Sequence, residues 1–404
     1  MLTLKPNFIV FVASCAMATL AGCDIKKNTT APEAVFTTIY HDNDINASYY
    51  PLGIAQQSNG QLIMLAGTAN DTSKYTWTGT YIMATDPDGK FLWDSNIASG
   101  NVNPVPNLIY SNGEVYFICM DEVTLQAQLM MVNSIEKNTS PVKTFSDIIY
   151  PLYTYQTSDG GLLIVSYDRM SRSTLLTKTD GAFNEVWQNN FNVMEDAEAK
   201  VIAHLSKLGQ QFPFFAGEIK SGSTTSHYFV NSFYNYSFSM LIVNAANGGQ
   251  TGVVNGYRYD GAISAALHLS EDTFAVARYT FGDNYLLPKA FINPDEVGTT
   301  NDLAGTKFSE LDYDAKVLLK EKGDGDQKRI IYITSTKIGQ LVMYQFSHDA
   351  GKLLKSNYYG HSNPVEIAAA INTSDGGMML LCRMIVAGRY PRIALYKVSS
   401  GEFN

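Results

Sequence analysis

Aromatic and arginine side chains recur in the longer loops between the expected strands. Aromatic rings can pack on the apolar faces of sugars or peptides, and guanidinium groups can donate hydrogen bonds to hydroxyls or carboxylates. The alternative is that each ring packs on its neighbours and each arginine is solvated, because loops carry aromatics for packing as well as for recognition. We predict a ligand-binding face that contains Tyr75, Trp77, Arg169, Tyr228, Tyr285, Arg389 and Tyr390.

No catalytic motif accompanies these residues. The sequence lacks a Gly-x-Ser-x-Gly nucleophile turn, a His-Glu-x-x-His zinc motif, a phosphate-binding loop and paired cysteines with metal-ligand spacing. Spacing along the chain leaves a convergent metal site open, but ligating histidines usually come in sets with supporting partners. We therefore predict no catalytic residue, no metal and no cofactor. We expect the histidines to be scattered surface or strand residues, namely His41, His204, His227, His268, His348 and His361.

The elements that must position these loops are short strands. Apolar or alternating runs are separated by Gly, Asn and Asp throughout, and only residues 195–208 have a helical period. Segments 55–67, 155–166 and 371–382 each repeat a strand, a tight turn and a strand. Asn-Gly and Asp-Gly favour such turns because they accept positive φ angles. The pattern predicts an all-β chain built from repeated hairpins.

Seven such hairpins can be counted along the chain. The looser copies are at Asn112-Gly113, Leu208-Gly209, Glu271-Asp272 and Ile338-Gly339. A second hairpin follows most of them, as in residues 80–93 and 175–187, so each repeat predicts a four-stranded sheet. We expect one β-propeller of seven four-stranded blades over residues 34–404, closed by residues 34–40 beside 393–398. The tight turns would lie on one rim and the ligand-binding loops on the other.

Two further predictions concern the core. Tyr234, Tyr236, Phe238 and Met240 alternate with other residues, which predicts that all four share one buried sheet face. Cys119 and Cys382 lie inside apolar runs, so we expect buried free thiols rather than a disulfide.

The repeats resemble those of bacterial lipid-anchored propeller lipoproteins, which combine Asp-Gly-Gly, an apolar run and Asp-x-x-Gly-x-x-x-Trp. Residues 84–93 (ATDPDGKFLW) also resemble a pyrroloquinoline-quinone-type propeller repeat shortened by one residue. The unit that ends at Trp187 lacks the glycine at the expected place. The resemblance therefore implies the fold and no quinone cofactor.

The N-terminus has the layout of a secretory signal. Lys5 precedes the apolar run 8–20, which is followed by Ala21 and Gly22. The sequence Leu20-Ala21-Gly22-Cys23 resembles the bacterial lipobox, and this resemblance implies that Cys23 carries acyl chains; the alternative is an ordinary cleaved signal. We predict a signal peptide over residues 1–22, a flexible tether over 23–33 and a lipid-anchored protein of the outer membrane, on its periplasmic or cell-surface face.

The charge of the chain narrows its partners. The formal net charge is −9, and loss of Lys5 with the signal makes it −10. Nucleic acid is excluded as a partner because its phosphates require clustered Lys and Arg. We expect a non-catalytic binding or assembly platform, an accessory lipoprotein of a glycan or peptide uptake complex that contacts an outer-membrane transporter or other lipoproteins. The alternatives are a lyase or glycosidase that uses the central funnel, and a scaffold resembling the propeller lipoprotein of the barrel-assembly machinery.

Overall fold

The computed structural model describes residues 36–41, 47–70, 77–313, 315–360, 363–386 and 390–403. The predicted signal peptide (residues 1–22), the predicted lipidation site Cys23 and the predicted tether (residues 23–33) lie outside these residues. Antiparallel strands dominate the described part of the chain, as the turn-rich sequence predicts.

The first half of the chain forms two sheets. An eight-stranded sheet contains β2 (Ala47–Gln56), β3 (Leu62–Asn70), β4 (Gly79–Thr85), β5 (Phe91–Val102), β6 (Ile109–Ser111), β7 (Glu114–Asp121), β8 (Gln126–Asn133) and β9 (Asn138–Ile149). A four-stranded sheet contains β10 (Pro151–Gln156), β11 (Leu162–Asp168), β12 (Ser173–Thr179) and β13 (Glu185–Asn192).

Three sheets follow the helix α2 (Glu198–Leu205). The first has β14 (Phe215–Ser221), β15 (Thr224–Tyr234), β16 (Ser237–Asn244), β17 (Gln250–Asn255) and the parallel edge strand β21 (Val297–Thr299). The second has β18 (Gly261–Ser270), β19 (Thr273–Thr280), β20 (Asp283–Phe291) and β22 (Thr306–Lys307). The third has β23 (Leu318–Lys322), β24 (Arg329–Ser335), β25 (Leu341–Ser347) and β26 (Leu353–Tyr359), with the 3-10 helix η1 (Gly325–Gln327) between its first two strands.

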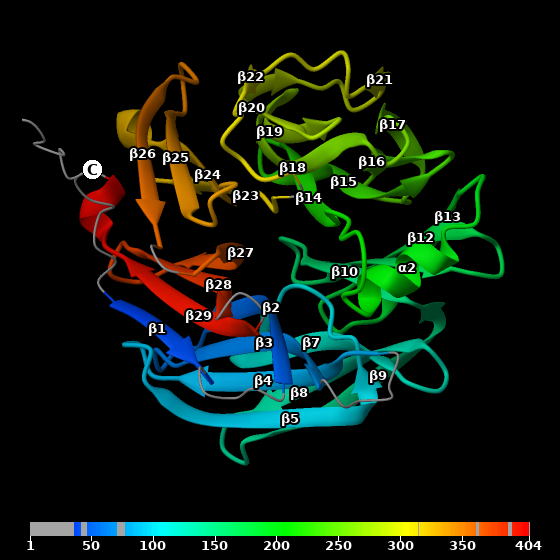
Figure 1. Ribbon diagram of the computed structural model, residues 1–404. Coiled ribbons are helices and arrows are strands. Elements are labelled where there is room, and N and C mark those ends of the chain that lie inside the picture. The colour runs from blue at the N-terminus through cyan, green and yellow to red at the C-terminus, as the bar shows by residue number, and fades with distance from the viewer. Residues whose placement is uncertain are drawn as a thin grey trace, which may run out of the picture.

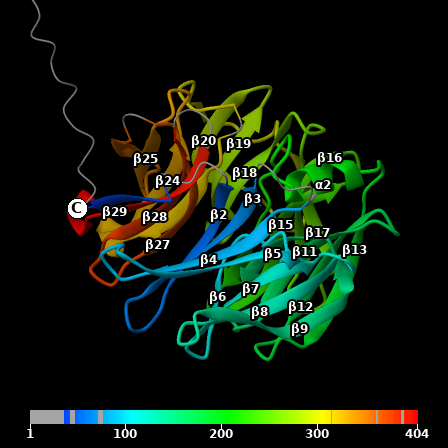
Figure 2. The same cartoon turned by 60° about the horizontal axis from the view of Figure 1, so that its bottom comes forward.

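The last sheet joins the two ends of the described chain. It contains β27 (Val365–Asn372), β28 (Met378–Val386), β29 (Tyr390–Val398) and, at its edge, β1 (Phe36–Tyr40), and the 3-10 helix η2 (Ser400–Phe403) follows. β1 pairs antiparallel with β29 from Phe36–Lys397 to Tyr40–Ile393, which confirms the predicted closure (Figure 2).

The six sheets are arranged around a common centre, and the fold is a single all-β propeller (Figure 1). The first strand of one sheet contacts the first strand of the next, as β14 contacts β18 and β18 contacts β23. Apolar side chains fill the space between neighbouring sheets, and Cys119 and Cys382 are buried free thiols there, as predicted. Helix α2 lies within predicted residues 195–208 and buries Val201 and Leu205 against the β10–β13 sheet.

The structure corrects the prediction of seven separate four-stranded blades. Five sheets of four or five strands are separate, and the remaining eight strands form one continuous sheet. The reason is that β5 extends to Val102 and pairs with β7 through Asn101–Asp121 and Val102–Met120. Within this sheet the tight-turn hairpin still occurs twice, at Gly60 and at Gly113.

Two of the predicted tight turns have different roles. Gly209 follows α2 rather than joining two strands, and the corresponding hairpin turns at Gly222 between β14 and β15. Gly339 joins β24 to β25, while the turn between β23 and β24 contains Gly323 and Gly325. The predicted hairpin at Gly209 was wrong, whereas the one at Gly339 is present but joins the second and third strands of its sheet. A glycine marks a turn without saying which two strands of the sheet it joins.

The predicted alternating core run is also wrong in part. β15 ends at Tyr234 and β16 begins at Ser237, so a hairpin turn interrupts the run, and Tyr236 is 64% exposed. Phe238 and Met240 are fully buried on β16, as predicted. A period of two holds only within one strand, and the turn at Asn235, with φ of 49°, contains neither glycine nor proline.

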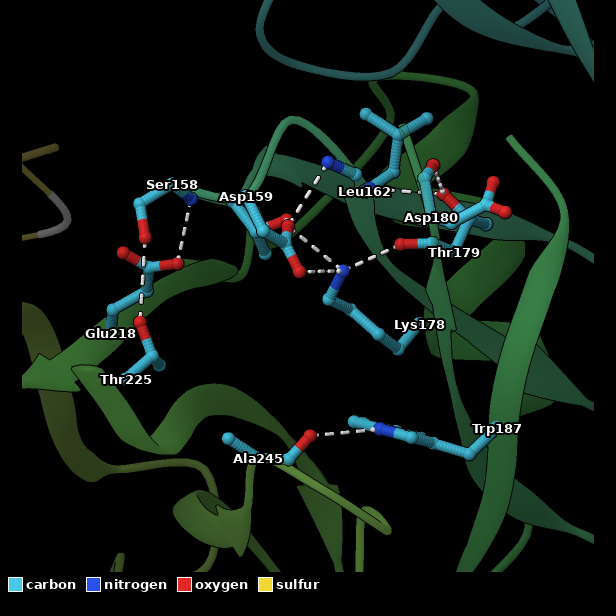
Figure 3. A network of polar contacts seen from close by, with 12 residues as sticks. Ser158, Asp159, Leu162, Lys178, Thr179, Asp180, Trp187, Glu218, Thr225 and Ala245 are labelled. Carbon is cyan, nitrogen blue, oxygen red and sulfur yellow. Dashed lines mark hydrogen bonds and ion pairs between the residues drawn. The ribbon is translucent and has the colours of Figure 1, made fainter. Parts of the chain in front are cut away.

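Lysine side chains brace two of the tight turns, through Lys178 with Asp159 and through Lys397 with Asp375. Figure 3 shows the first of them. Asp159 accepts hydrogen bonds from Thr157 Oγ1, from the Gly161 amide at 3.1 Å and from Lys178 Nζ. A Cβ atom on Gly161 would lie 1.9 Å from the carbonyl oxygen of Thr179, so only glycine fits there. The next sheet is tied to the same turn, because the Ser158 amide donates to Glu218 at 2.8 Å.

We use two names for the ends of the propeller. The turn rim is the end where tight turns, such as those at Gly60, Gly160 and Gly376, join the first and second strands of a sheet. The α2 rim is the opposite end, which holds α2 and the turns between second and third strands.

Candidate functional site

The innermost strands enclose a central cavity of about 1840 Å³. The first strands of all six sheets line it, namely β2, β10, β14, β18, β23 and β27. Pockets for small ligands usually measure about 300 to 1,000 Å³. The cavity is therefore large enough for an extended ligand, such as several units of a glycan or a stretch of peptide.

Tyrosine side chains form part of the cavity wall. Tyr50 lies on β2, Tyr153 and Tyr155 lie on β10, and Tyr279 lies on β19. Burial raises the pKa of Tyr153, Tyr155 and Tyr279, so these phenols keep their protons at neutral pH. They can present a ring face and a neutral hydroxyl donor to a ligand.

Two lysines approach the cavity near the α2 rim. Lys207 follows α2 and its Nζ lies 3.5 Å from the carbonyl oxygen of His204, while Lys316 precedes β23 and its Nζ donates to the carbonyl of Ala368 at 2.6 Å. Lys316 is exposed to the cavity, and the surrounding propeller desolvates its ammonium. This desolvation lowers the pKa of each lysine to about 8, and the charges of Lys316 and Arg383 add to the effect on Lys207.

His204 holds the segment that carries Lys207. Its Nδ1 accepts a hydrogen bond from the Phe212 amide at 3.1 Å, and its ring packs edge-on against Phe214 at 4.9 Å. Burial lowers the pKa of His204 well below its ordinary value, so the ring is neutral. The helix that presents it begins favourably, because Asp196 accepts from the Glu198 amide and Glu198 lies in the first turn.

Three glutamates elsewhere on the wall, Glu218, Glu321 and Glu366, lie beside cations. Arg383 donates to Glu366 from Nε at 3.0 Å, and Lys220 Nζ lies 3.6 Å from Glu218. Glu321 lies 2.8 Å from the Lys328 ammonium and 3.0 Å from Nε2 of His348. These three carboxylates are therefore engaged by neighbouring residues.

The sequence-predicted ligand residues are not brought together. Tyr75 and Arg389 lie outside the described residues, as does the side chain of Tyr390 on β29. Tyr228 is buried between sheets near Trp187, so its predicted place in an exposed loop is wrong. It lies within β15, where the chain is a strand rather than a loop.

The other predicted residues lie towards the α2 rim but in different sheets. Trp77 is half-buried, with its ring 6.3 Å from that of Tyr150. Arg169 is exposed, 3.9 Å from Glu198 of α2. Tyr285 packs beneath the guanidinium of Arg278 at 4.1 Å. None of these three lines the central cavity.

Sequence reasoning missed Lys207 and Lys316 as cavity residues. Lys207 lies just beyond a helix and Lys316 just before a strand, and each approaches the cavity from a different sheet of the propeller. No local motif distinguishes them from surface lysines. The only available signal was the helical period of residues 195–208, which placed an insert between two hairpins.

In the described part of the chain, no group of three or more histidine, cysteine, aspartate or glutamate side chains is placed to hold a metal ion, and His361 lies outside this part. No described helix is both long and apolar enough to cross a membrane.

Comparisons with known proteins return similarity of shape alone. No protein-family model and no curated protein matches the chain. Among solved structures, YCF48 from Cyanidioschyzon merolae is 12% identical, with coverage of 89% of this chain and 98% of that chain and a TM-score of 0.49. Sqt1 from Saccharomyces cerevisiae is 11% identical, with coverage of 91% and 100% and a TM-score of 0.47. The β-propeller domain of the Trilobed protease from Pyrococcus furiosus is 11% identical, with coverage of 89% and 98% and a TM-score of 0.46.

Proposed function

We propose that the chain is a lipid-anchored envelope protein whose propeller is a non-enzymatic binding platform, an accessory lipoprotein of an outer-membrane uptake complex for glycans or peptides. The observation that carries the proposal is the central cavity of about 1840 Å³, lined by tyrosines and by charged side chains. Its volume suits an extended polymer segment better than a compact cofactor. The anchor is inferred from Leu20-Ala21-Gly22-Cys23.

The pairing of three of the wall glutamates favours binding over catalysis. A glycosidase needs one carboxyl group that holds a proton beside one that is ionised. Glu218, Glu321 and Glu366 each lie beside a cation instead. The neutral tyrosines and these fixed ion pairs are suited to hold hydroxyl and amide groups without transferring a proton.

The test is direct binding of the full-length protein, kept in detergent micelles, to arrays of glycans and of peptides. We expect binding to one class without release of product. Tyr155→Ala should weaken it by about 1 to 3 kcal/mol if the ring is a buried anchor. Tyr236→Ala is the matched control, because Tyr236 is an exposed tyrosine outside the cavity.

Two results would replace this proposal. Cleavage of a bound glycan would make the protein a carbohydrate-active enzyme. Failure to bind either array, together with co-purification of the outer-membrane barrel-assembly machinery, would favour the scaffold. In either case, the effect of replacing Trp77 or Tyr285 by alanine can be compared with that of Tyr155→Ala, because Trp77 and Tyr285 lie outside the cavity and Tyr155 lines it.

A further inference from the structure

We propose that the α2-rim end of the central cavity binds an anionic oxygen group of the ligand, a carboxylate or an oxyanion ester, between Lys207 and Lys316. The inference rests on the proposed function in one respect, since it takes the central cavity as the ligand site. It adds the chemical class that this end of the cavity selects.

The first support is the lack of counter-charge. Among the described residues, neither the Lys207 nor the Lys316 ammonium forms an ion pair with a carboxylate; their hydrogen-bond partners are the carbonyl oxygens of His204 and Ala368. Each ammonium has three donors, so one carbonyl bond leaves donors for a ligand. By contrast, Arg383 and Lys220 on the same wall are matched by Glu366 and Glu218.

The second support is the way the two lysines are held. The 2.6 Å bond to the Ala368 carbonyl fixes the Lys316 ammonium, and neutral His204 anchors the segment that carries Lys207. The two lysines come from the β13–β14 connection and from the approach to β23, and both line the same end of one cavity. Two like charges held near each other repel, and an anion between them relieves this repulsion.

Among the described residues, the other charged groups that line the cavity form no ion pair with the two lysines. Asp260 and Asp312 line the same cavity, Glu366 is engaged by Arg383, and His204 is neutral. The whole chain carries a net charge of −9, so general attraction to a basic surface does not operate here. An anion that binds this chain must be attracted by a local feature, and these lysines provide one.

The test uses inorganic sulfate as the probe, because its charge stays constant from neutral to alkaline pH. Isothermal titration calorimetry on the full-length protein in micelles should show one site at pH 7.5. The dissociation constant should rise as pH increases through about 8, where the lysines lose their protons. Lys207→Met with Lys316→Met should weaken binding at least tenfold, and the exposed Lys352→Met should leave it unchanged.

A charge-preserving variant keeps the test informative if the methionine variant does not fold. Lys207→Arg with Lys316→Arg should retain sulfate binding at pH 9.5, where the parent protein has lost it, because arginine does not titrate in this range. Equal sulfate affinity of the parent protein at pH 7.5 and 9.5 would overturn the inference. So would unchanged affinity in a folded methionine variant.

Failure of the inference can be told apart from failure of the proposed function. A neutral glycan or peptide that binds with dependence on Tyr155, while sulfate does not bind, would overturn the anionic site and leave the platform intact. Sulfate binding that depends on Lys207 and Lys316 supports the anionic site even if the protein binds nothing on the glycan and peptide arrays.

Discussion

The Nζ atom of Lys178 lies 2.9 Å from Oδ2 of Asp159, and Lys397 holds the equivalent place 2.7 Å from Asp375 in the sheet that closes the ring. Both lysines are nearly buried, while both carboxylates are largely exposed. At the equivalent turn of the first sheet Asn59 replaces the aspartate, and Ala84, opposite Ile63, occupies the lysine position. A turn with an aspartate therefore has a lysine on the third strand, and the turn with an asparagine has an alanine there.

Asp159→Asn should destabilise the protein by about 1 to 3 kcal/mol, because it removes the counter-charge of a lysine whose side chain is only 4% exposed. Urea denaturation followed by circular dichroism would measure the loss. Asp147→Asn is the matched control, since Asp147 is an exposed strand residue without an ion pair among the described residues. Equal stability of the two variants would show that the brace contributes nothing.

The Asp375 turn should make stability depend on acid pH. Hydrogen bonds from Lys397, from Thr373 and from the Gly377 amide hold the pKa of Asp375 far below its ordinary value of 3.8. A carboxyl group with a lowered pKa in the folded state stabilises that state above its ordinary pKa, and the contribution is lost as pH falls towards the lowered value. Unfolding free energies measured from about pH 5 to about pH 2 should decline more steeply for the parent protein than for Asp375→Asn. Parallel curves would contradict this assignment.

Closure of the propeller should depend on Tyr40. The aromatic side chain of Tyr40 is buried, and its hydroxyl donates to the carbonyl of Gly89 at 2.5 Å, which ties β1 to the neighbouring sheet. Tyr40→Ala should cost about 3 kcal/mol or more, and Tyr40→Phe should cost about 1 kcal/mol. Thr37→Ala, on the exposed part of β1, should have little effect. Thermal unfolding would rank the three variants, and a mild Tyr40→Ala phenotype would mean that β1 is dispensable for closure.

Cys23→Ser should release the protein from the membrane fraction, because acyl chains on this cysteine would be its main bilayer contact. Fractionation of cells after an alkaline wash, which removes proteins held only by partners, would measure the change. Retention of the washed variant in the membrane pellet would rule out the lipid anchor.

Local chemistry explains most of what could be predicted. The turns at Gly60, Gly160 and Gly376 and the pairing of Phe36–Tyr40 with β29 were predictable, because turn formation depends on neighbouring residues and strand pairing on short apolar patterns. The turn at Asn235 escaped prediction because no glycine or proline marks it. The pairing of β5 with β7 was not predicted either, since it involves only two residue pairs and no sequence pattern marks it.

The sequence by itself determined an all-β chain of hairpins, two buried thiols and the absence of a recognisable catalytic motif. Only the tertiary structure decided which side chains share a cavity. Lys207 and Lys316 face one cavity because the sheets of the propeller are arranged around a common centre. Residues that precede the innermost strands of different sheets therefore converge there. Tyr228 looked like a loop aromatic and is buried between sheets for the same reason. Proximity across sheets depends on the closed ring, and no stretch of neighbouring residues encodes it.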